Sequence, residues 1–126
     1  MREIGVVILA VAGSLLAGCR TDAAPVPASA GAPNAAEVRY INETGRAIYR
    51  GRPFERSRGF VSAGFASGYA VCLRAPMQGG RFDHTLLILQ RRIDGAVSQV
   101  EDDATILRAA SDVGACRNRT DWVPAR

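Results

Sequence analysis

The chain has 126 residues and a formal net charge of +4, and all 16 of its basic residues are arginine. Because domains commonly have about 100–150 residues, this length excludes an assembly of several domains. The arginine bias fits either codon usage in a GC-rich genome or selection for bidentate anion contacts, which arginine makes and lysine does not.

The amino-terminal stretch MREIGVVILAVAGSLLAGC, residues 1–19, joins a short basic region to an apolar run. Arg2 and the amino terminus supply the positive charge, and the small or apolar residues 4–16 follow. This run has the length of the core of a secretory signal and is shorter than the roughly 20 residues that span a membrane. We therefore expect the protein to be exported.

The end of this run, Leu16-Ala17-Gly18-Cys19, resembles the lipobox of bacterial lipoprotein signal peptides. In that family the signal peptide, here residues 1–18, is cleaved before the cysteine. The resemblance implies that the Cys19 thiol carries a diacylglycerol and that its amino group is acylated, for example with palmitate. Arg20 stands where an aspartate would favour the inner membrane, so the resemblance implies the periplasmic side of the outer membrane. The alternative is an ordinary signal peptide with an incidental cysteine, or a short apolar helix.

Residues 19–33 comprise Cys19 and a stretch rich in Ala and Pro, with Val26 as its largest apolar side chain. Such a composition buries too little apolar surface to offset the entropy lost on ordering, so it predicts a flexible tether. The folded domain is then expected to be residues 34–126, which is small enough for a covalent crosslink to matter.

The sequence NAAE, residues 34–37, has the pattern of a helix capping box, and Gly45 stands where a glycine would end the helix. We predict a helix over residues 35–44. Three apolar residues would share its inner face: Ala35, Val38 and Ile41. Partial alternation in EVRYI leaves a strand as the alternative.

An arginine-rich stretch follows, in which Gly51 and Pro53 favour a loop with a short helical turn. Aromatic residues among these arginines would suit a nucleic acid, but an envelope location favours an anionic lipid or an acidic envelope protein. The alternative is a solvated basic face whose aromatic residues pack in the core. The candidate interaction face consists of Arg46, Arg50, Arg52, Arg56 and Arg58.

Two hairpins are predicted from residue 60 onward. Strands at 60–65 and 69–75 would be joined by a three-residue turn that ends in Gly68. Strands at 84–93 and 96–102 would be joined by Asp94 and Gly95, a strong hairpin signal. In this register Leu89 would face Val100 and Leu87 would face Asp102.

The remaining segments complete an α+β prediction. The stretch DDATILRAAS, residues 102–111, suggests a short helix capped by Asp103, and the tail from residue 116 has no clear period. Strands in a row with helices at the ends predict an N-terminal helix packed on an antiparallel sheet of about four strands.

The two cysteines besides Cys19 are Cys72 and Cys116. An even pair in an exported domain predicts a disulfide, with a redox or metal-binding pair as the alternative. A structural zinc site generally takes four Cys or His ligands, and His84 is the single histidine. We therefore expect a disulfide and neither a metal nor another cofactor.

The chain lacks a Gly-x-Ser-x-Gly elbow, a phosphate-binding loop and a dinucleotide fingerprint. The domain resembles small outer-membrane lipoproteins of proteobacteria, to which no activity is assigned. We expect a non-enzymatic interaction or assembly module on the envelope. The alternatives are an inhibitor of a cell-wall hydrolase such as lysozyme, whose Ser-Gly-x-x-Tyr loop this chain does not match, and a small enzyme with a polar pocket around His84.

Overall fold

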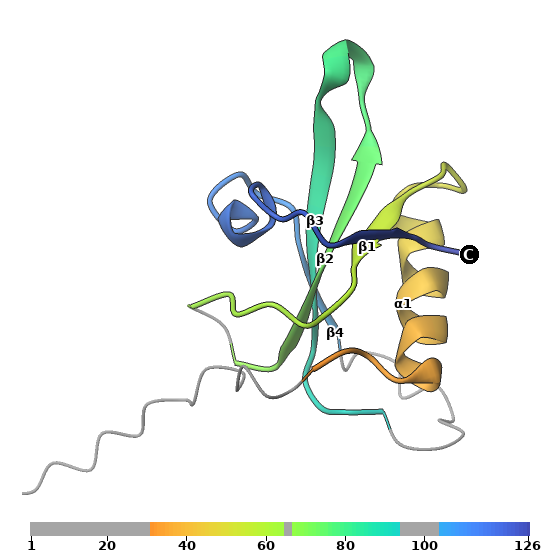
Figure 1. Cartoon of the computed structure of the whole chain (residues 1–126), viewed down its shortest axis with the longest axis vertical. Helices are drawn as coiled ribbons and strands as arrows, with labels where there is room; N and C mark the ends of the chain where they lie inside the picture. Colours follow the sequence, from red (N-terminus) through yellow and green to blue (C-terminus); the bar gives the residue numbers. More distant parts are fainter. Residues whose placement is uncertain (1–30, 65–66, 94–103) are drawn as a thin grey trace, which may run out of the picture.

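The computed structural model describes residues 31–64, 67–93 and 104–126. Within these ranges a single helix, α1 (Ala35–Ile48), packs with a five-stranded sheet, which confirms the α+β prediction with five strands rather than four (Figure 1). The strands run in the order β4-β3-β2-β1-β5, and all four neighbouring pairs are antiparallel. Their bounds are β1 (Glu55–Ser57), β2 (Tyr69–Pro76), β3 (Phe82–Leu89), β4 (Ala104–Leu107) and β5 (Trp122–Pro124), with short 3₁₀ turns η2 (Gln78–Gly80) and η3 (Gly114–Cys116).

Several predictions concern residues outside the described ranges. They include the signal peptide, Cys19 and the tether up to residue 30, and also the Asp94-Gly95 turn, the strand at 96–102 and the Asp103 cap. The signal peptide, the lipidation of Cys19 and the tether remain predictions.

The capping box at the start of α1 is confirmed. The Asn34 side chain accepts a hydrogen bond from the Glu37 N–H at 2.9 Å, and Glu37 Oε1 accepts one from the Asn34 N–H at 2.9 Å. The inner face differs from the prediction, because Ala35 is exposed while Glu37, Ile41 and Gly45 are buried.

The helix continues one turn past its predicted end at Gly45. Its last residue is Ile48, and the left-handed residue that ends it is Arg50, with φ of 52°. The Gly51 N–H donates to the Arg46 carbonyl at 2.9 Å, which is the bond of a Schellman cap. Gly45 is a glycine for another reason: a Cβ there would lie 2.3 Å from Cζ of the Phe54 ring.

The strand predicted at 60–65 is wrong, since within the described residues Val61 forms only an isolated bridge with Ala70. The strand beside β2 is β1, inside the segment predicted as a loop. β1 is short and polar, so it carries no apolar alternation. Because β2 and β5 flank it on both sides, its backbone groups find partners despite that weak pattern.

The prediction for the second hairpin is also corrected. β4 pairs with β3 in a register that sets Leu89 against Ala104 and Leu87 against Ile106. The predicted partners, Val100 and Asp102, are therefore wrong. The predicted helix within residues 102–111 is wrong too, because Ala104–Leu107 form β4, where Thr105 and Ile106 suit a strand.

The sheet has two buried faces. Ile41, Tyr49 and Phe54 cover one face, against Val71, Leu73 and Leu87. On the other face Val113 and Cys116 pack against Cys72, Leu86 and Ile88. The predicted disulfide between Cys72 and Cys116 is present on this second face, with both residues fully buried. Figure 1 shows α1 on one side of the sheet and the segment after β4 on the other.

Candidate functional site

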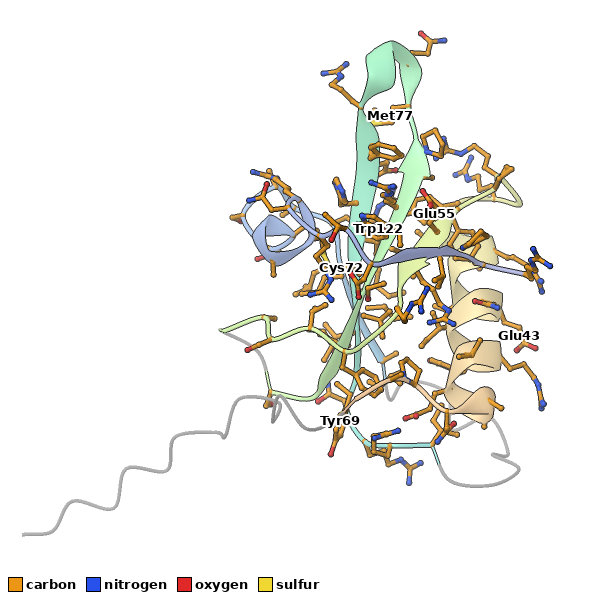
Figure 2. The ribbon with its side chains drawn as sticks, viewed as in Figure 1. Glu43, Glu55, Tyr69, Cys72, Met77 and Trp122 are labelled. Atoms are coloured by element: carbon orange, nitrogen blue, oxygen red, sulfur yellow. A yellow bond between two sulfur atoms is a disulfide. The ribbon has the colours of Figure 1, made fainter. Side chains whose placement is uncertain are left out.

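The hairpin formed by β2 and β3 projects beyond the rest of the domain (Figure 1). Gly79 and Gly80 form its tip with φ of 78° and 74°, values that suit glycine. Near the tip two large apolar side chains are exposed, Met77 at 47% and Phe82 at 36%, and Figure 2 shows Met77 at this end of the hairpin. Exposed apolar groups on a projection are typical of contact surfaces.

A shallow, open pocket of about 220 Å³ lies alongside this projection. The hairpin contributes Met77, Phe82, Asp83 and His84 to its lining. The other wall belongs to the segment 108–117 that follows β4, with Arg108, Ala110, Val113 and Arg117. The pocket therefore combines apolar surface with cationic side chains.

Positive charge is in excess around this pocket. Asp83 is the one carboxylate in its lining. Arg108 bonds this carboxylate, and Arg52 lies 3.8 Å from the same oxygen. Arg117 donates to the neutral carbonyl of Ala110 at 2.6 Å. The pocket and its border thus hold three guanidinium groups and one carboxylate, a surplus of positive charge that suits an anionic ligand.

A stack of aromatic and arginine side chains adjoins the pocket. The Arg74 guanidinium lies 4.0 Å from the centre of the Phe82 ring and 4.3 Å from that of Trp122. Arg74 Nε also donates to Glu55 at 3.0 Å. Guanidinium groups held over aromatic faces are stabilised by the ring quadrupole, so this stack fixes the Phe82 ring at the pocket rim.

His84 lies between the Phe82 and Trp122 rings, at 6.2 and 6.0 Å. Burial lowers the pKa of His84 from 6.5, and the nearby charges of Arg74 and Arg117 lower it further. The imidazole is therefore neutral at pH 7. His84 is one of the residues that line this pocket, as the small-enzyme alternative requires. The other residues that line the pocket carry no hydroxyl or thiol that the imidazole could activate as a nucleophile.

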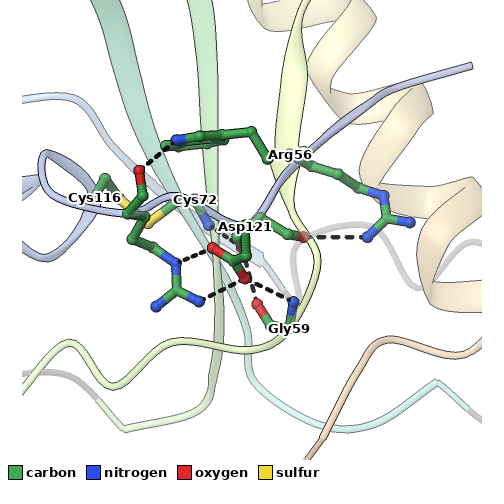
Figure 3. Close-up of polar contacts among 8 residues, drawn as sticks. Arg56, Gly59, Cys72, Cys116 and Asp121 are labelled. Atoms are coloured by element: carbon green, nitrogen blue, oxygen red, sulfur yellow. Dashed lines mark hydrogen bonds and ion pairs between the residues drawn. A yellow bond between two sulfur atoms is a disulfide. The ribbon is translucent and has the colours of Figure 1, made fainter.

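The segment 108–117, which forms one wall of the pocket, is followed by a set of hydrogen bonds close to the disulfide (Figure 3). Asp121 accepts two hydrogen bonds from Arg119, at 2.7 and 2.8 Å, and one from the Gly59 N–H at 3.3 Å. The bonds from Arg119 lower the pKa of the Asp121 carboxyl. Trp122 Nε1 donates to the Arg119 carbonyl at 2.8 Å. These contacts hold the irregular chain that carries the wall.

The arginines predicted as an interaction face lie in three places, and Arg58 is exposed directly after β1. Arg46 and Arg50 are exposed at the end of α1, and Arg52 turns toward Asp83 on the hairpin. Arg56 lies on β1, half-buried, and donates to the Ser57 carbonyl at 3.1 Å. Burial and the neighbouring charge of Arg58 lower the pKa of Arg56. Of the five, only Arg52 joins the charges beside the pocket.

The cationic wall was not predicted from the sequence. Arg108 and Arg117 lie far along the chain from Met77 and Phe82, and their encounter depends on the disulfide and on the end of β4. The one available signal was a pair of large apolar residues, Met77 and Phe82, flanking a glycine turn.

Comparison with protein-family models, with curated proteins and with solved structures found no match. Among the residues that the structure describes, no three or more His, Cys, Asp or Glu side chains are grouped so as to hold a metal ion. No helix in the same ranges of the chain is long and apolar enough to cross a membrane.

Proposed function

We propose that this protein is a lipid-anchored envelope protein whose folded domain is a non-enzymatic interaction or assembly module. Cys19 is the anchor, and the stretch after it is the tether. The domain, residues 34–126, faces the periplasm from the outer membrane and engages an acidic envelope protein or an anionic lipid.

The observation that carries the interaction role is the projecting hairpin beside a cationic pocket. Met77 and Phe82 expose apolar surface at the tip, and Arg52, Arg108 and Arg117 supply charge next to it. Methionine, aromatic residues and arginine are enriched in protein interfaces. The resemblance of residues 16–19 to a lipobox supports the anchor.

Mass spectrometry of the full chain purified from bacterial membranes tests the anchor. We expect a mature chain that begins at Cys19 and carries the mass of a diacylglycerol and an acyl chain. The Cys19→Ser variant should lack this mass. A wild-type chain without lipid would refute the anchor.

Crosslinking in intact envelopes, followed by purification, tests the interaction role. The double variant Met77→Ser, Phe82→Ser should reduce recovery of a specific crosslinked partner. The matched control is Ile106→Ser, which removes another exposed apolar side chain, 45% exposed on β4. Absence of any specific partner, or equal loss with the control, would refute the interaction role.

Inhibition of a cell-wall hydrolase is a second candidate, and the exposed hairpin tip favours it. Arg81 follows the glycine turn and is exposed. Glycoside hydrolases generally carry two carboxylates in their cleft, which an arginine on a projecting tip could meet. A lysozyme assay with micromolar purified protein tests this. Inhibition that Arg81→Gln abolishes would support the candidate, and undiminished hydrolysis would remove it.

A further inference from the structure

The edge of β3 beside the pocket has no neighbouring strand among the described residues. β4 pairs only with residues 86–89 of β3 and leaves residues 82–85 uncovered on that side. The chain then turns away as the segment 108–117, which is joined to the sheet through Cys116. The open edge and the pocket therefore adjoin each other.

The hydrogen-bonding pattern shows which backbone groups face this edge. The Met77 N–H donates to the Arg81 carbonyl, in the same register as the β2–β3 ladder. Bonded pairs alternate along an antiparallel ladder, so Asp83 and Thr85 direct their N–H and C=O groups toward β2. Phe82 and His84 direct theirs to the opposite side, where β4 has ended. Four backbone groups are thus presented as the template for another strand.

From this arrangement we infer that an extended acidic segment of a partner protein binds by adding a strand to β3 at Phe82 and His84. The inference rests on the proposed interaction function and names the chemistry of the partner. The backbone of the segment pairs with the open edge. Because successive side chains of a strand point to opposite faces, carboxylates on one face contact Arg108, which bonds Asp83, and carboxylates on the other face contact Arg117 beside His84. The apolar side chains of the segment pack on Met77 and Phe82.

Charge complementarity selects this occupant. The charged side chains that line the pocket at the open edge are Arg108, Arg117 and Asp83, and Asp83 is already shared between Arg52 and Arg108. A second copy of this chain would bring the same positive charges against them, and this repulsion disfavours edge-to-edge pairing of two copies. Strand addition gives affinity through the main chain, while the flanking pocket gives specificity for side chains.

Peptide binding to the full chain, purified in detergent, tests the inference. The probe is a fluorescent octapeptide in which pairs of glutamate alternate with pairs of valine, so that each face of the strand carries both, with both ends blocked. We expect saturable binding in fluorescence anisotropy and slower hydrogen exchange of the Phe82 and His84 amides. The same peptide with alternate backbone amides N-methylated keeps its charges and side chains. It should bind at least about tenfold more weakly, because it cannot pair along the edge.

Variants give effects of opposite sign. Arg108→Gln and Arg117→Gln should each weaken binding by about fivefold, since each removes a charge-assisted contact. Asp83→Asn should strengthen binding by about threefold, because it removes the carboxylate that competes for Arg52 and Arg108. Arg46→Gln removes the same charge at the end of α1 and should leave affinity unchanged. Unfolding curves of each variant confirm that the fold is kept.

Two results would overturn the inference. Equal binding of the N-methylated peptide would exclude strand addition. The second result has two parts: the acidic peptide does not bind, and phosphatidylglycerol vesicles bind the wild type more strongly than Arg108→Gln. That result would make the surface a membrane site instead. If envelope crosslinking still recovers a specific partner, the proposed interaction function is supported, and only the binding of an acidic segment by strand addition is refuted.

Discussion

The two faces of the sheet are covered by different means. On one face Ile41 of α1 and Tyr49, the residue directly after it, pack against the strands. Tyr49 is almost fully buried, and its hydroxyl is 2.9 Å from the Asp83 carbonyl and 2.8 Å from Thr85 Oγ1. Burial raises the pKa of Tyr49 to about 12. A helix satisfies its own backbone groups, so this face needs only apolar packing and a few polar anchors.

The other face is covered by a segment of turns that includes the 3₁₀ helix η3. Such a segment cannot satisfy its backbone alone. Side chains complete it, as when Arg117 donates to the Ala110 carbonyl and Trp122 to the Arg119 carbonyl. The Cys72–Cys116 bond then joins the segment covalently to β2.

The difference between the two covers explains how a small domain exposes a site. Regular structure on the α1 face forms a continuous cover. The irregular cover leaves the β3 edge at residues 82–85 open, and the pocket forms there. The disulfide that stabilises this cover therefore also holds one wall of the proposed site.

The largest expected effect is that of the disulfide. Reduction, or the variant Cys72→Ala with Cys116→Ala, should lower the free energy of unfolding by about 4 kcal/mol, because the bond closes a loop with a sequence separation of 44. Urea unfolding of the oxidised and reduced protein measures this. If the free energy of unfolding changes by less than about 1 kcal/mol, apolar packing alone holds the irregular segment on its face of the sheet, as it holds α1 on the other face.

The α1 face has its own polar anchor, the fully buried side chain of Glu37. It bonds Arg92 at 2.8 Å and accepts from the Ile93 N–H at 3.1 Å, besides its role in the cap. Glu37→Ala should cost about 3 kcal/mol in urea unfolding, because the partners of a buried charge lose their counterpart. Glu43→Ala, an exposed site on the same helix, should change stability by under about 0.5 kcal/mol.

This anchor also predicts a pH dependence. Burial alone would raise the pKa of Glu37, but its hydrogen bonds from Arg92, Asn34 and Ile93 outweigh burial and lower it below 4.5. A lowered carboxyl pKa contributes stability that is present above pH 4.5 and lost as pH falls through the folded-state value. The wild type should lose more stability than Glu37→Ala between pH 6 and the acid range. Equal losses would contradict this assignment.

A smaller effect is expected at Gly45, where α1 approaches Phe54. Gly45→Ala should lower stability by about 2 kcal/mol although alanine favours helix, because its Cβ would overlap the Phe54 ring. Ala47→Gly, at an exposed site of the same helix, should cost about 1 kcal/mol from propensity alone. Phe54→Leu in the Gly45→Ala background should reduce the loss. A stabilised Gly45→Ala would show that packing on this face is loose.

Local signals predicted the structure correctly where the contacts that decide it are local. The capping box joins residues three apart in the chain, so Asn34 and Glu37 predicted it directly. The alternation from Tyr69 to Arg74 predicted β2, whose two sides lie in the two cores. The even number of cysteines left after Cys19 predicted the disulfide between Cys72 and Cys116.

Predictions failed where distant partners decide the structure. Residues 104–107 have too few positions to separate helix from strand by period, and their pairing with β3 selects the strand. Ser57 has no apolar signal, yet it is buried because its hydroxyl accepts a hydrogen bond from the Cys72 N–H at 3.1 Å. The cationic pocket joins two segments that no sequence spacing relates.

The sequence by itself determined the α+β class, the start of the helix, the alternation of β2 and the pairing of Cys72 with Cys116, because short-range geometry and residue chemistry carry that information. Tertiary structure decided the order of the five strands, the register of β4, the reason for Gly45 and the open edge beside Arg108 and Arg117. Each of these depends on which distant backbone and side-chain groups remain for a segment to contact, and the linear order of residues does not record that.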